Sequence, residues 1–127
     1  MNLRQGFLVL TAIGLVPIAL GYGLVPQQSL DYLFAVPVQN VNGAHIFRAV
    51  MGLYLGLAGF WVVGAFQVRL RQAALLSLVV FMFGLAGGRL LSLAIDGMPH
   101  WLLLAYLVLE LGMGAIGLQL LKRPESS

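Results

Sequence analysis

The sequence AHIFRAVMGLYLGLAGFWVVGAF, residues 44–66, decides the fold class of this chain. It contains a single charged residue, Arg48, and it is long enough to cross a hydrocarbon core of ~30 Å as an α-helix, which takes ~20 residues. Similar apolar runs cover approximately residues 5–25, 73–95 and 101–121. Because four strands cannot close a barrel, only helices satisfy the backbone of such a chain in lipid. We therefore predict an all-α fold: an integral membrane bundle of four transmembrane helices, in one domain over residues 1–127.

The composition agrees with a membrane protein and excludes several kinds of chemistry. Hydrophobic residues make up 61% of the chain and charged residues 9%, whereas a soluble domain has about 25% charged residues. Cysteine is absent, so disulfides, thiolate nucleophiles and cysteine-based metal sites are excluded. The net charge of +3 does not indicate nucleic-acid binding, because the basic residues lie mostly at the ends of apolar runs. The first run is longer than the ~7–15 apolar residues of a signal peptide, so we expect it to be retained as a helix.

The links between the runs predict antiparallel neighbours and an orientation in the membrane. Residues 67–72 and 96–100 form short links, and the longer link 26–43 contains a short interfacial turn at about 30–35. Trp61 and Trp101 are expected at the two membrane interfaces. Lysine and arginine concentrate on one side, so the positive-inside rule predicts a multi-pass membrane protein with both termini in the cytoplasm. The residues on that side are Arg4, Arg69, Arg71, Lys122 and Arg123.

Three charged residues lie inside the apolar runs and mark a candidate site. A charge in a membrane segment costs at least ~2.5 kcal/mol, so it normally faces the bundle interior and has a partner. At ~1.5 Å per residue, Arg48, Arg89 and Glu110 all fall in the outer half of the membrane. Helical spacing places them on or near glycine-rich faces, which we expect to pack together inside the bundle. The candidate site residues are Arg48, Arg89, Asp96, Glu110, His45 and Ser92.

Several interpretations of these charges remain open. They can form an outward-facing pocket that binds a small anionic or polar ligand or a lipid, or that passes a proton. Glu110 can instead pair with Arg89 or Arg48 as a structural lock, and the chain can be an accessory subunit of a larger membrane complex. No Walker loop, G-x-S-x-G or H-E-x-x-H motif is present, so an enzyme is the weaker interpretation. The sequence implies no particular cofactor, although His45 or His100 as a haem or pigment ligand stays open.

Four segments of the chain resemble the DUF4345 family of membrane proteins. They are the run from His45 to Gly56 with Phe60-Trp61 after it, Gly88-Arg89-Leu-Leu-Ser92, the turn Asp96-Gly97-x-Pro99, and Leu109-Glu110-Leu111. The resemblance covers roughly residues 40–120. It implies a small four-helix bacterial membrane protein of unknown function, so it supports the fold and supplies no activity. The family's arginine on the second helix, Gly-Arg on the third and glutamate on the fourth correspond to Arg48, Arg89 and Glu110.

Overall fold

Five helices make up the fold, and four of them are long enough to cross a membrane. The computed structural model describes residues 2–37 and 40–123. The long helices are apolar enough to span a bilayer, and no strand occurs in the described part of the chain, so the predicted all-α membrane bundle is confirmed. The helices are α1 (Leu3–Gly23), α2 (Pro26–Phe34), α3 (Val41–Phe66), α4 (Val68–Ile95) and α5 (Trp101–Lys122).

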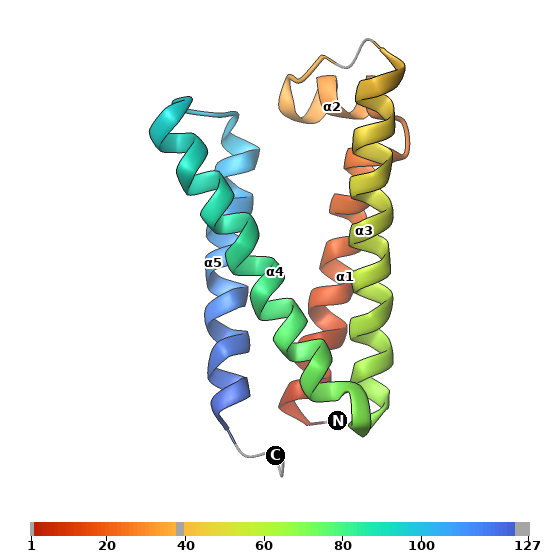
Figure 1. Ribbon diagram of the computed structural model, residues 1–127, viewed down its shortest axis with the longest axis vertical. Coiled ribbons are helices and arrows are strands. Elements are labelled where there is room, and N and C mark those ends of the chain that lie inside the picture. The colour runs from red at the N-terminus through yellow and green to blue at the C-terminus, as the bar shows by residue number, and fades with distance from the viewer. Residues whose placement is uncertain (1, 38–39, 124–127) are drawn as a thin grey trace.

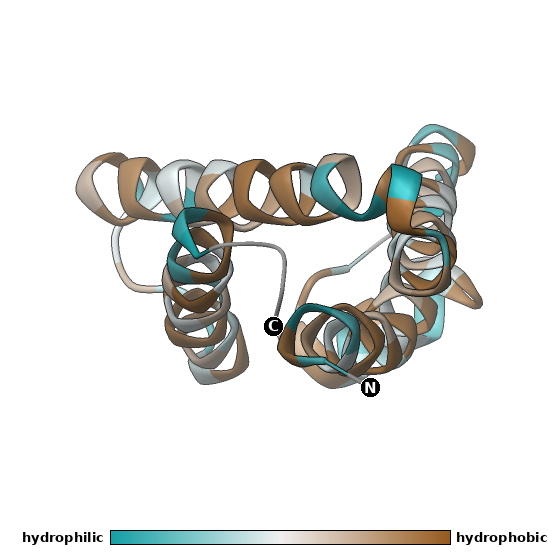
Figure 2. Ribbon diagram, turned by 90° about the horizontal axis from the view of Figure 1, so that it is seen from below, coloured by the Kyte–Doolittle hydropathy of each residue, from teal (hydrophilic) through white to brown (hydrophobic). Residues whose placement is uncertain are grey.

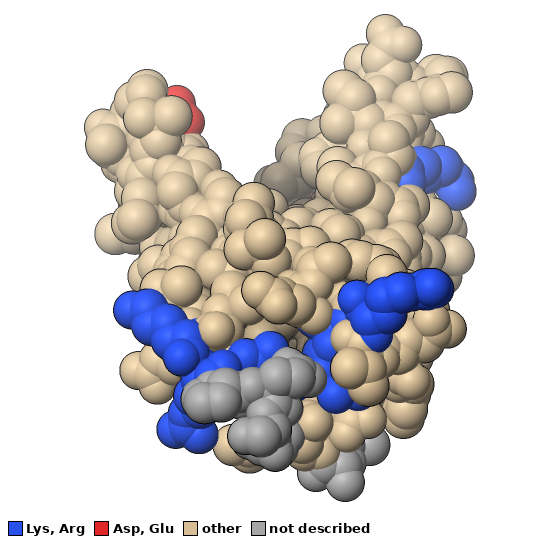
Figure 3. All heavy atoms as spheres, turned by 60° about the horizontal axis from the view of Figure 1, so that its bottom comes forward, with Lys and Arg blue, Asp and Glu red and all other residues tan. Residues whose placement is uncertain are grey.

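The long helices form two pairs that meet at one end of the molecule and separate toward the other. Helix α1 packs along α3 and α4 packs along α5, while α2 lies across the open end (Figure 1). Apolar residues dominate the long helices on all sides, as expected of helices surrounded by lipid (Figure 2). We call the closed end, where Figure 3 shows basic side chains gathered, the basic end, and the other the α2 end. The basic end carries Arg4, Arg69, Arg71, Lys122 and Arg123.

A sharp corner joins α3 to α4 at the basic end. Gln67 alone separates the two helices, so the predicted link 67–72 is wrong, and α4 begins at Val68 rather than near residue 73. The buried Arg71 side chain turns back and donates to the Ala65 carbonyl oxygen at 2.9 Å, which satisfies an end carbonyl of α3. Gly64 lets α4 approach closely, since a Cβ there would lie 3.3 Å from the Leu70 carbonyl oxygen. The charges of residues 67–72 therefore belong to a helix and its cap, not to a loop.

A partly buried polar contact joins α3 and α4 near this corner. Trp61 is fully buried, and its indole N–H donates to the Ser77 hydroxyl at 3.0 Å, so α3 and α4 are joined by a polar contact inside the apolar core. Trp61 therefore lies in the core of the bundle, near the basic end of α3. Trp101, by contrast, is exposed at the start of α5.

The α2 end is built from a short helix and a capped turn. The turn predicted at about residues 30–35 is a nine-residue helix, with Pro26 at its start and Ala35 in the left-handed conformation at its end (φ 57°). At the other turn, Gly97 adopts φ 98°, which favours glycine and closes α4. His100 then caps α5, because its Nδ1 accepts from the Leu102 amide at 3.2 Å. His100 thus has a structural role at a helix start.

Candidate functional site

An ion pair between α4 and α5 forms the centre of the candidate site. The Nε of Arg89 donates to both carboxylate oxygens of Glu110, at 2.9 and 3.0 Å. The Arg89 side chain is 21% exposed and that of Glu110 is 9% exposed, so the pair is largely withdrawn from the surroundings. Each charge has the partner that its position in an apolar helix requires. The expectation that the membrane charges meet inside the bundle therefore holds for these two residues.

Aromatic residues of α1 and α5 contact the arginine, and further aromatic residues of α2 and α3 pack behind them. The Arg89 Nη2 donates to the Tyr22 hydroxyl of α1 at 3.2 Å, and the guanidinium lies 5.8 Å from the centre of the Tyr106 ring on α5. Tyr22 stacks on Phe34 of α2 at 5.4 Å and meets the edge of Tyr54 on α3 at 5.6 Å. The ion pair is therefore held by side chains from the whole bundle, and not by α4 and α5 alone.

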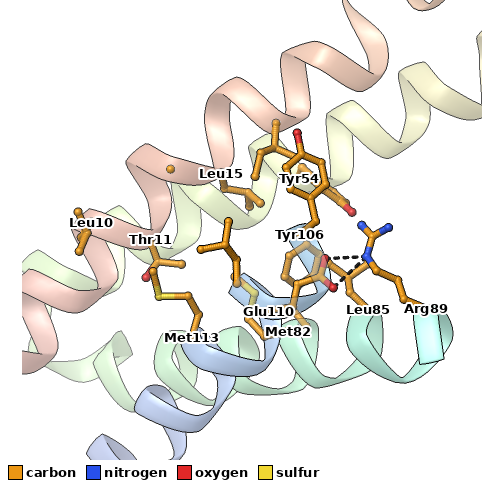
Figure 4. A pocket seen from close by; sticks show the side chains of 14 residues that line it. Leu10, Thr11, Leu15, Tyr54, Met82, Leu85, Arg89, Tyr106, Glu110 and Met113 are labelled. Carbon is orange, nitrogen blue, oxygen red and sulfur yellow. Dashed lines mark hydrogen bonds and ion pairs between the residues drawn. The ribbon is translucent and has the colours of Figure 1, made fainter. Parts of the chain in front are cut away.

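A cavity of about 250 Å³ lies beside the ion pair, between the two helix pairs. Arg89 and Glu110 are the only charged residues among its described lining, and the rest is mostly leucine, methionine and aromatic side chains. Figure 4 shows the ion pair toward one end of the cavity and Leu10 and Thr11 of α1 toward the other. The cavity is thus an apolar space with a polar group near one end, which is how small-molecule sites are commonly built.

The mouth of the cavity faces sideways, toward the surroundings of the long helices. Leu10 and Gly14 on α1 and Leu109 on α5 line the cavity and are also exposed on the outer surface of the bundle. Leu10 and Leu109 are apolar residues in membrane-spanning helices, so in a bilayer this mouth meets acyl chains.

Sequence reasoning missed three tyrosines and a threonine at this site. Tyr22, Tyr54 and Tyr106 each lie inside an apolar run, where a hydroxyl group is costly unless it has a partner or a use. Thr11 donates its hydroxyl to the Phe7 carbonyl oxygen at 2.7 Å and keeps its oxygen lone pairs. The sequence does contain a signal for these residues, because each places a hydroxyl group in a membrane-spanning run. A hydroxyl group indicates a buried polar site less strongly than a full charge does.

The remaining predicted site residues do not join the ion pair. Arg48 and His45 are exposed on α3, and Arg48 makes no hydrogen bond or ion pair within the described residues, so its predicted meeting with Glu110 is wrong. Ser92 donates to Asp96 at 2.7 Å on the exposed end of α4. Ser92 and Arg89 both line a second hollow, of about 370 Å³, between α4 and α5. Of the predicted site residues, only Arg89 and Glu110 line the cavity together.

Some of the glycine-rich helix faces pack inside the bundle, and others face outward. Gly114 and Gly117 on α5 pack closely, because a Cβ at either would lie within 3.0 Å of an α4 side chain. The glycines on the Arg48 face of α3, and those on α4, have open space at that position and are exposed. The prediction of inward packing is confirmed for α5 and wrong for the other faces: Gly52, Gly56, Gly59, Gly84 and Gly88.

The fold and the site together define a class: a small four-helix membrane protein with a paired arginine and glutamate beside an apolar cavity. Within residues 2–37 and 40–123, no three His, Asp or Glu side chains come together as a metal site would need. The family model described as "Domain of unknown function (DUF4345)" matches residues 3–121, so the chain belongs to the DUF4345 family. Neither the curated proteins nor the solved structures contain a match to the chain.

Proposed function

We propose that this protein binds a lipid-like amphiphile taken from the bilayer. The observation that carries the proposal is a largely buried ion pair at one end of a cavity whose mouth faces the hydrocarbon. The apolar lining accommodates a chain, and the Arg89 and Glu110 groups meet the polar part of the molecule. A role beyond binding, such as transfer or presentation of the molecule, would use the same side opening.

The positive-inside rule supplies the orientation in this proposal. The basic end faces the cytoplasm of a bacterial inner membrane, both termini lie on that side, and the ion pair falls in the outer half of the bilayer. A bound headgroup then lies closer to the outer leaflet, with its chain directed toward the basic end.

A substitution at the mouth tests the binding proposal. Gly14 has open space at its Cβ and lines the cavity, so Gly14→Leu fits the fold and fills the space needed by a ligand chain. Overpacking of this kind costs about 1–3 kcal/mol, so affinity falls by about fivefold to 150-fold. Native mass spectrometry of the purified protein with methyl oleate and oleate measures this loss. The matched control is Gly112→Leu on α5, which also has open space and lies outside the cavity lining.

Binding of neither probe, or equal binding by the Gly14→Leu and Gly112→Leu variants, would refute the proposed function. A loss confined to Gly14→Leu, with thermal stability unchanged in both variants, supports it. The thermal measurement separates a filled cavity from a damaged fold.

The outward face of α3 favours a second candidate function, as a subunit of a membrane complex. This face presents glycines with open space beside an arginine that has no ionic partner in the described residues. Small residues let membrane helices approach closely, and a buried arginine selects a helix that carries an acid. Helix α4 of a second copy has these properties when it runs antiparallel to α3. Its small residues and its acid repeat every four residues, as the residues of the α3 face do. In this register Gly84, Gly88, Ser92 and Asp96 lie opposite Phe60, Gly56, Gly52 and Arg48.

Crosslinking in native membranes tests this second function. The chain has no natural cysteine, so single cysteines at Gly56 and Gly88 in co-expressed copies report only the contact under test. A disulfide between the two copies supports association through these faces, and a pair at Leu10 and Gly88 serves as a control. Absence of the first crosslink, together with a monomeric mass in mild detergent and no stoichiometric partner, contradicts the complex.

A further inference from the structure

The ion pair at the cavity has no net charge, and this limits the charge that a bound ligand can carry. Arg89 contributes one positive charge and Glu110 one negative charge, and the described lining holds no other ionised side chain. Arg48, which the sequence suggested as a second cation, is exposed on α3 and does not line the cavity. An anionic headgroup placed here would leave one uncompensated negative charge in an apolar site, and such a charge is strongly disfavoured.

A hydroxyl without a partner identifies what the headgroup must offer. Tyr54 is 5% exposed and lines the cavity, yet its hydroxyl makes no hydrogen bond within the described residues. The side chain is held in place by edge contacts of its ring with Phe81 at 5.0 Å and Tyr22 at 5.6 Å. Its hydroxyl oxygen is not among the fully buried polar atoms of the described residues that lack a partner, so this oxygen keeps some exposure where the side chain lines the cavity. From there the hydroxyl can donate to an acceptor atom of a ligand.

Arg89 supplies a second donor to the same space. A guanidinium has five N–H groups, and the contacts with Glu110 and Tyr22 engage only its Nε and Nη2. The arginine can therefore donate to a ligand while it keeps its pairing with Glu110. A carbonyl oxygen has two lone pairs and suits two such donors, whereas a hydrocarbon end satisfies neither.

A groove continues the cavity along α1 and α5 and sets the shape of the apolar part. A cleft of about 580 Å³ lies between these helices at the basic end, and Leu10 lines both it and the cavity. The two spaces adjoin at Leu10, so the open region extends from the ion pair toward the basic end between two helices. Its lining is mostly apolar and becomes polar in the cleft, where Asn2, Gln119 and Arg123 contribute. A single extended chain fits such a groove better than a rigid, compact ring system.

We infer that the ligand is an uncharged single-chain amphiphile whose headgroup carries a carbonyl-type acceptor, received by Tyr54 and Arg89 beside the Arg89–Glu110 pair. The inference rests on the proposed function and names its ligand class. A fatty-acyl ester and a prenylated quinone share this chemistry.

Methyl oleate and oleate form a minimal pair for the test, because they share the chain and the carbonyl and differ in charge. Native mass spectrometry of the purified protein should give at least about tenfold tighter binding of methyl oleate than of oleate, with 9-octadecene weaker than the ester. Tyr54→Phe removes one hydrogen bond, so it should weaken methyl oleate binding by about five- to tenfold and leave 9-octadecene unchanged. Tyr32→Phe, at an 88% exposed tyrosine of α2, is the matched control.

The outcomes separate this inference from the proposed function. Oleate binding that equals or exceeds methyl oleate binding, and that is lost in Gly14→Leu, overturns the neutral ligand and leaves the binding site standing. Equal loss of ester and hydrocarbon in Tyr54→Phe overturns the acceptor role, because it indicates a changed cavity shape. Failure of every probe overturns both proposals. A prenylated benzoquinone added to the series distinguishes the two ligand classes. Tighter binding of the quinone than of methyl oleate indicates a quinone, and weaker binding indicates an acyl ester.

Discussion

Removing one partner of the Arg89–Glu110 pair should destabilise the protein unequally, depending on which partner is lost. Glu110→Leu leaves a guanidinium that cannot lose its charge, whereas Arg89→Met leaves a carboxyl group that can take up a proton in an apolar site. We therefore expect Glu110→Leu to be the more damaging substitution. The double substitution removes both charges and should be less damaging than the sum of the two single changes.

The size of the effect follows from the burial of the pair. Breaking a fully buried ion pair costs about 3–5 kcal/mol. The Arg89 side chain keeps 21% exposure toward the cavity, so we place Glu110→Leu at the lower end, about 3 kcal/mol. By the size scaling of soluble domains, a chain of this length loses about 3–4 °C in Tm per kcal/mol, which gives a fall of about 10 °C.

Thermal unfolding in detergent, followed by circular dichroism, measures these changes as a double-mutant cycle. Arg48→Met is the control, because this exposed arginine lacks an ion pair in the described residues, and its loss should shift Tm by no more than about 2 °C. Strictly additive single substitutions would show that Arg89 and Glu110 are not coupled. A Tm loss in Arg48→Met as large as that in Glu110→Leu would contradict the assignment of the pair.

Two further predictions concern packing and orientation. Gly23→Ala places a Cβ 2.7 Å from the Phe47 carbonyl oxygen and should cost about 1–3 kcal/mol. Gly52→Ala meets open space inside α3, so it should leave Tm unchanged or raise it slightly, because alanine favours a helix over glycine by up to about 1 kcal/mol. Equal losses of Tm in a thermal scan would contradict the α1–α3 contact. Single cysteines at Arg69 and Met98 should react with a membrane-impermeant maleimide from the cytoplasmic and the outer side, respectively. Labelling of both from the same side would overturn the topology.

The sequence predicted the number of long helices because each apolar run is a strong and independent signal. It did not predict the corner at Gln67, because no glycine or proline follows that would mark a sharp turn. The charges of the next residues suggested a loop instead. In the structure these residues continue a helix, and Arg71 folds back to the Ala65 carbonyl group. Local charge alone does not distinguish an exposed loop from a helix whose arginine caps its neighbour.

For the site, the cost of a buried charge predicted the pairing of Arg89 with Glu110, and the same reasoning failed for Arg48. Helical spacing places residues on a common face but does not say which neighbour covers that face. The face of α3 that carries Arg48 points away from the bundle, because Tyr54, Ala58 and Trp61 occupy its inward side. The three tyrosines around Arg89 come from different helices, so only the assembled fold brings them together.

The single-residue corner at Gln67 has a mechanical consequence. The two helix pairs are fastened firmly where α3 meets α4, and the cavity lies farther along between them. At ~1.5 Å per residue α4 is about 42 Å long, so each degree of rotation at the corner displaces its far end by about 0.7 Å. At the α2 end, the hydrogen bond from Arg89 to Tyr22 and the contact of Phe34 with Tyr106 join the two helix pairs, so these contacts hold that end against rotation at the corner.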